Sequence, residues 1–171
     1  MQTTMRRNRR AERLLTVAVL VFMFTALPCA PKDARDPVKL LGGYSLMRES
    51  VVDAVTWTIE KKGGLSIHFE AGFSEGLWAD PKDVHSYAWM RSQTVNGYEV
   101  LFALTKPGSR TRWEPKDSRG LPAGSILLVT FLLDGEQSFH TANFSAKIAS
   151  EQELADALLM VMTFDPSKGK F

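Results

Sequence analysis

The chain has 171 residues and a formal net charge of +2, with 44% hydrophobic and 10% aromatic residues. This composition excludes a disordered chain, and the length is enough for one domain with its own core. The positive charge is concentrated in the first 30 residues, which contain five arginines and one glutamate. The rest of the chain has a net negative charge. The basic balance therefore gives no argument for a nucleic-acid partner.

Residues 1–30 have the outline of an export signal. A basic segment, MRRNRRAER, precedes the apolar run LLTVAVLVFMFTAL, which has signal-peptide length and is shorter than the roughly 20 residues of a spanning helix. Three alternatives follow: cleavage near Ala30, lipid attachment at Cys29, or retention as an uncleaved membrane anchor. Each predicts a protein exported to the periplasm or cell envelope. Cys29 is the only cysteine, so the domain itself is predicted to contain no disulfide.

Three hairpins are predicted in the following part of the chain, after a spacer over residues 31–43 and a short first strand at Tyr44–Arg48. Alternation of apolar and polar residues, or short apolar runs rich in β-branched residues, indicates the strands, and glycine-containing turns join them. Asn-Gly between two such runs is the strongest short hairpin signal, since both turn residues need a positive φ. The strand pairs are 54–60 with 65–71, 87–94 with 98–105 across Asn96-Gly97, and 125–133 with 136–148 across Asp134-Gly135.

A capped helix is predicted to end the domain. Ser150 and Glu153 form a capping box, and Leu154, Leu158 and Val161 place one apolar stripe along the helix that follows. The stripe needs a sheet to cover. The sequence therefore predicts a single α+β domain over residues 44–164, an antiparallel β-sheet meander of three hairpins with a C-terminal amphipathic helix packed on one face. Residues 165–171 are expected to be a frayed tail.

The predicted meander has a geometric consequence. If each hairpin pairs with the next, all three tight turns fall at one end of the sheet. The long loops 72–86 and 106–124 then leave the sheet together at the other end, which is the default place for a binding site.

The order of hairpin, Val95-Asn96-Gly97-Tyr98 turn, hairpin and terminal helix resembles small uncharacterised bacterial envelope proteins. In outline it is also similar to domains of the PsbP/Mog1 kind, over Tyr44 to Phe164. Such domains often open with a Pro-x-Gly-Trp-like turn, where this chain has Gly42-Gly43-Tyr44. The resemblance implies an antiparallel sheet with helical cover, and it carries over no catalytic residues.

Enzymatic chemistry has one candidate residue. Ser74 lies in a G-x-S-x-G pattern, which in α/β-hydrolases turns a strand into a helix and exposes the serine. The residues that follow contain Pro81 and lack helical periodicity, so the pattern favours a loop serine. The three histidines, His68, His85 and His140, have no metal-ligand spacing. No catalytic residue, metal or cofactor is therefore predicted, and a small serine hydrolase using Ser74 is the alternative.

Binding residues are predicted in the two long loops. Trp78 and Trp113 each lie among glycine, proline and charged residues, with no local apolar periodicity to bury them. Tryptophan is enriched at binding centres. The loop of Trp113 also carries a local charge of about +3, to which Arg110, Arg112 and Lys116 contribute. Two accounts stay open: the rings cap the open end of the core, or they flank a shallow cleft that draws in an anionic group.

The function that these patterns favour is a non-enzymatic binding or envelope-accessory domain, exported from the cytoplasm. Its partner would be a protein or an anionic ligand at the loop end of the sheet, with membrane contact only through the N-terminal segment. An immunity or inhibitor protein with one tight partner is a third class.

Overall fold

The computed structural model describes residues 36–51, 54–73, 76–109, 111, 113, 124–134 and 137–168. The export signal predicted for residues 1–30 lies outside them. The strands are β1 (Tyr44–Val51), β2 (Ala54–Lys61), β3 (Ser66–Phe73), β4 (Tyr87–Val95), β5 (Tyr98–Thr105), β6 (Ser125–Asp134) and β7 (Gln137–Ile148). The helices are α2 (Glu151–Val161) and the short 3-10 helices η2 (Pro81–Ser86) and η4 (Pro166–Lys168).

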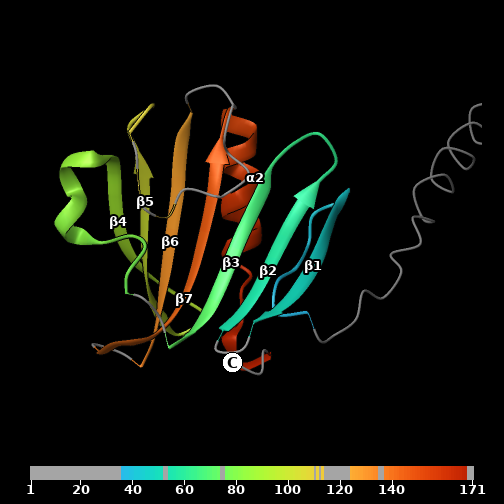
Figure 1. The fold of residues 1–171 in the computed structure, drawn as a ribbon, viewed down its shortest axis with the longest axis horizontal. Helices are drawn as coiled ribbons and strands as arrows, with labels where there is room; N and C mark the ends of the chain where they lie inside the picture. Colours follow the sequence, from blue (N-terminus) through green and yellow to red (C-terminus); the bar gives the residue numbers. More distant parts are fainter. Residues whose placement is uncertain are drawn as a thin grey trace, which may run out of the picture. The chain divides into compact units, whose positions relative to one another are not determined.

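The protein is an α+β domain in which seven strands form one antiparallel sheet and α2 covers one face of it, as predicted (Figure 1). The strand order is β1-β2-β3-β7-β6-β5-β4. The sheet therefore consists of two meanders, β1 to β3 and β4 to β7, and the pairing of β3 with β7 joins them. The last strand of the chain lies at the centre of the sheet.

The prediction that all three tight turns share one end of the sheet is wrong. It assumed that β3 pairs with β4, whereas β3 pairs with β7. Following the antiparallel pairs across the sheet, the Asn96-Gly97 turn and the β6–β7 turn lie at one end. The β2–β3 turn, the β5–β6 connection and the start of α2 lie at the other end. The segment between β3 and β4 leaves the sheet at the first end and re-enters at the second.

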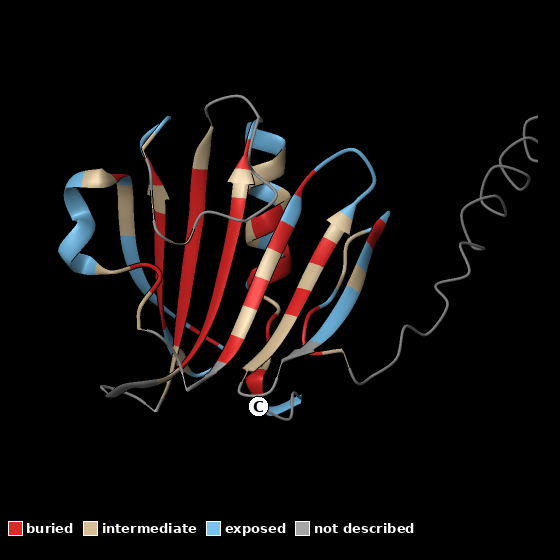
Figure 2. Ribbon diagram, in the orientation of Figure 1, coloured by how far each residue is buried: buried red, intermediate tan, exposed pale blue. Residues whose placement is uncertain are grey.

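The main core fills the space between the sheet and α2, on what we call the helix face. Strand alternation places one set of side chains there, including Trp57, Phe69 and Phe144. Trp57 stacks on Phe69 with ring centroids 4.3 Å apart, and Phe69 lies 4.7 Å from Phe144. The central strands are buried over most of their length, whereas β1 is largely exposed (Figure 2).

The predicted apolar stripe of α2 is only partly correct. Val161 is fully buried, but Leu154 and Leu158 are half-buried at the margin of the core. The residues pressed against the sheet are Ala157, Met160 and Val161. The small side chain of Ala157 lets the helix approach the strands closely, so the contact line is rotated relative to the leucines.

The capping box is confirmed, with one change of partner. The Ser150 hydroxyl accepts a hydrogen bond from the Glu153 amide at 3.2 Å. The Glu153 carboxylate, in turn, accepts from the amide of Ala149 at 2.7 Å rather than from Ser150. Two amides at the start of the helix are therefore satisfied by side chains.

The folded unit extends beyond residues 44–164 on both sides. Val38 is 2% exposed and belongs to the helix-face core, although residues 31–43 have the composition of a spacer. The Asp165 amide donates to the Pro37 carbonyl at 2.8 Å, and Pro166 is buried. The described part of the predicted tail therefore packs against the segment that precedes β1.

Tyr44 attaches β1 to α2. Its hydroxyl donates to Asp156 Oδ2 at 2.8 Å. Burial, the hydrogen bond to Asp156 and the charge of that carboxylate raise the pKa of Tyr44 to about 12. The same hydrogen bond, with a second from Gln152, lowers the pKa of Asp156. The edge strand and the helix are thus linked by a side-chain contact as well as by the core.

The Asn96-Gly97 turn has the backbone that its sequence predicts, with φ of 51° at Asn96 and 88° at Gly97. We expect Gly97→Val to lower the free energy of unfolding by about 1–2 kcal/mol, because a β-branched residue is strained at positive φ. A Cβ at Gly97 meets nothing within 4 Å, so crowding does not contribute. Urea unfolding measures the effect. The control is Gly42→Val, at a glycine with equal space and no positive φ, which should be nearly neutral; equal losses in both variants would contradict the prediction.

Candidate functional site

A second apolar cluster covers the opposite face of the sheet, which we call the loop face. Alternate residues of β5 and β6, among them Leu101 and Leu128, point to this face. Trp78 and Ala79, from the segment between β3 and β4, pack on them and are 4% and 0% exposed. That segment takes the place that a second helix would occupy in a three-layer fold.

Polar side chains of the central strands hold the Trp78 segment in place. The Thr130 hydroxyl accepts hydrogen bonds from the amides of Trp78 and Ala79, each at 3.1 Å. Thr130 donates in turn to Asn143 Oδ1 at 2.7 Å, and Asn143 Nδ2 donates to Thr141 Oγ1 at 2.9 Å. Both threonines and the asparagine are completely buried. Two amides of a loop that crosses the sheet are thus satisfied without water.

The sequence did not single out these polar residues. Thr141, Asn143 and Ser145 occupy alternate positions of β7, a pattern that is typical of a solvent-facing side of a strand. The structure instead buries all of them, and Asn143 accepts a hydrogen bond from the Trp78 amide at 3.4 Å. The Ser145 hydroxyl is buried without a hydrogen-bond partner among the described residues. Only the long-range approach of the segment distinguishes these positions from an exposed face.

The two tryptophans predicted as binding residues are in contact. Trp78 stacks on Trp113 with centroids 5.0 Å apart and an interplanar angle of 17°, and its indole also stacks with His68 at 5.8 Å. Trp78 is buried and Trp113 is half-buried. The geometry of Trp78 fits the account in which the ring caps the core. Trp113 lies over it and keeps part of its surface in water.

The route by which the tryptophans meet differs from the predicted one. The described part of the β3–β4 segment crosses the loop face at Trp78 and Ala79, over the central strands, and the β5–β6 connection begins at the second end of the sheet. The rings therefore meet over the face of the sheet rather than at a shared end. Arg110, Arg112 and Lys116 lie outside the described residues.

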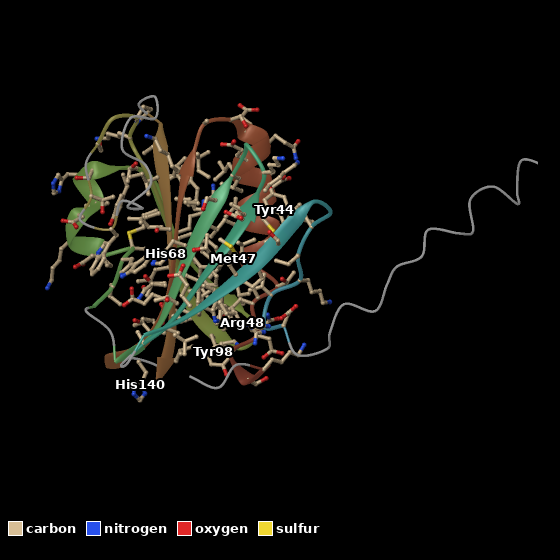
Figure 3. All side chains as sticks on the ribbon, turned by 45° about the vertical axis from the view of Figure 1, so that its right-hand side comes forward. Tyr44, Met47, Arg48, His68, Tyr98 and His140 are labelled. Carbon is tan, nitrogen blue, oxygen red and sulfur yellow. The ribbon has the colours of Figure 1, made fainter. Side chains whose placement is uncertain are left out.

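The candidate catalytic and metal-binding residues can be placed only where they fall among the residues that the structure describes. Ser74 lies outside them. His68 lies opposite Ser145 and His140 opposite Phe73, so the two histidines are separated along the β3–β7 pair (Figure 3). Strand alternation also places them on opposite faces of the sheet. Within the described ranges, no group of three or more histidine, cysteine or acidic residues could hold a metal ion.

Comparison with protein-family models, with curated proteins and with solved structures found no match for the chain. The resemblance to envelope proteins and to PsbP/Mog1 domains stays a prediction. In the part of the chain that the structure describes, no helix is long and apolar enough to cross a membrane. The fold and the loop-face cluster define the class, an α+β protein with one antiparallel sheet.

Proposed function

We propose that the chain is an exported, non-enzymatic binding domain of the cell envelope, and that its ligand or partner carries an anionic group. The observation that carries the proposal is the half-buried indole of Trp113, fixed on a buried Trp78. Export is supported by the basic and apolar pattern of residues 1–30. These two supports are independent of each other.

Stacking on Trp78 fixes the position of Trp113 within the long connection between β5 and β6. The indole of Trp78 is held by its burial, and its amide is held by Thr130. Trp113 rests on that ring, so its own position on the loop face is defined. A partly exposed tryptophan on a rigid support offers contact area at low entropic cost, as binding centres require.

The charge near this point supports an anionic ligand. Arg110 and Arg112 precede Trp113, and Lys116 follows it. A cationic chain segment attached to a fixed aromatic ring attracts anions and adds a stacking or apolar contact once they arrive. The chain beyond residue 30 is net negative as a whole, whereas the segment around Trp113 is locally positive.

Binding measurements with defined anionic probes test the proposal. The probes are inorganic phosphate, heparin, and vesicles containing phosphatidylglycerol, which separate a small anion, an anionic polymer and a lipid surface. Titration of tryptophan fluorescence should detect at least one of them. The triple variant Arg110→Ala, Arg112→Ala, Lys116→Ala should weaken that binding at least about ten-fold, with loss of its salt dependence.

A matched variant controls for net charge. Lys39, Lys62 and Lys82 are exposed, and their replacement by alanine removes the same charge elsewhere on the domain. If affinity falls equally in both triple variants, the probe is attracted by the net charge of the domain rather than by the segment around Trp113. That result would contradict the proposal. Failure of all three probes to bind would also contradict it.

A further inference from the structure

The two edges of the sheet differ in how they are protected. An edge strand presents unpaired backbone groups, and proteins commonly block such edges with bulges, charges or a covering segment. The edge strand β4 has an irregularity between Tyr87 and Trp89, and η2 leads directly into it. It also carries the exposed Arg91. These features oppose the addition of a further strand at β4.

The edge strand β1 also carries exposed charges, Arg48 and Glu49, but its register has no irregularity and no helix leads into it from the described residues before Tyr44. Its pairing with β2 runs in unbroken register over all eight residues, from Tyr44 to Val51. Its sequence, YSLMRESV, contains neither glycine nor proline. Met47 projects to the loop face of the sheet and is 44% exposed, and among the described residues it is the exposed large apolar side chain that lies on a strand (Figure 3). A regular strand of this length is suited to pairing with another strand.

We propose that β1 pairs antiparallel with β1 of a second copy of this chain, centred on Met47. A two-fold axis perpendicular to the sheet keeps each face continuous, and it requires one residue to lie opposite its own copy. That register extends the sheet through both copies and covers the exposed Met47 side chains with each other.

Charge selects this register over its neighbours. A centre at Arg48 or at Glu49 would place like charges directly opposite each other, which is destabilising. With Met47 at the centre, Arg48 lies opposite Leu46 and Glu49 opposite Ser45. Arg48 keeps its ion pair with Asp36 at 2.7 Å on the helix face. A centre at Leu46 would pair fewer residues of β1.

Cysteine cross-linking tests the register. In the full-length chain, Cys29, the only cysteine, is first replaced by serine. Met47→Cys should then give a disulfide-linked dimer on mild oxidation, since residues opposite each other across a strand pair are close enough. Ser45→Cys is the matched control on the same strand and face. Its two copies would lie four residues out of register, roughly 13 Å apart, and should not cross-link.

Sedimentation of the Cys29→Ser chain without added cysteine gives a second measurement. It should show a concentration-dependent dimer, and Met47→Lys should raise its dissociation constant at least about ten-fold, because two like charges then face each other. Met47→Thr controls for loss of the methionine, and should weaken the dimer less. A monomer at all concentrations, or equal cross-linking at positions 45 and 47, would overturn the proposal. Because neither measurement involves an anionic probe, the result is independent of the proposed function.

Discussion

Replacement of Trp78 by alanine is expected to lower the free energy of unfolding by about 3–5 kcal/mol. The indole is 4% exposed and packs with Leu101, Ile126 and Leu128 on the loop face. Its removal opens a cavity over the central strands and takes away the support on which Trp113 rests. The segment would still reach Thr130 through its amides, so the loss is one of packing. Urea unfolding followed by circular dichroism measures it.

A double-mutant cycle separates the two tryptophans. Trp113→Ala alone should cost less, because Trp113 is only half-buried. The loss for the double variant should fall short of the sum of the single losses by about 0.5–1.5 kcal/mol, the size expected for a stacked aromatic pair. If Trp78→Ala leaves the unfolding midpoint unchanged, the account of Trp78 as a core residue is wrong. Strict additivity would mean that the stack contributes no energy of its own.

Phe164→Ala is expected to have an effect of similar size, about 3–5 kcal/mol. Phe164 is completely buried, and its ring lies 4.9–5.2 Å from the rings of Phe69, Phe131 and Phe144. Its carbonyl accepts a hydrogen bond from Asn96 Nδ2 at 2.7 Å, which connects the segment after α2 to the β4–β5 turn. Thermal and urea unfolding should both report the loss.

The control for this prediction lies two residues earlier. Met162 is 46% exposed at the end of α2, so Met162→Ala removes a large apolar side chain from water rather than from the core. It should change the free energy of unfolding by no more than about 0.5 kcal/mol. Comparable losses at both positions would contradict the placement of Phe164 at the centre of the aromatic cluster.

Local patterns predicted the elements of the fold but not all of their neighbours. The three hairpins and the capped helix follow from alternation, turn residues and a cap, which act over a few residues. The pairing of β3 with β7 brings together Ile67 and Ala146, and no local signal specifies it. The error about the ends of the sheet followed from that one missing contact. The rotation of α2 likewise depends on how closely Ala157 meets the sheet.

The candidate site was predictable only through its aromatic residues. Trp78 and Trp113 are conspicuous because nothing in their sequence surroundings buries them. Their stacking, and the buried Thr130–Asn143 pair beneath Trp78, depend on a segment that crosses the face of the sheet. Alternating polar residues on a strand indicate which side chains share a face. They do not indicate whether that face is covered.

The central position of β7 also determines when the domain can form. As the chain is synthesised from its N-terminus, β1 to β3 can assemble early, and β4 to β6 can follow as a second unit. Until residues 137–148 emerge, β3 and β6 each keep an edge that has no partner. The final closure joins segments far apart in the chain, such as those of Ile67 and Ala146, and non-local closures of this kind are slow. We therefore expect a chain truncated before β7 to aggregate through two exposed strand edges, rather than to fold as a smaller domain.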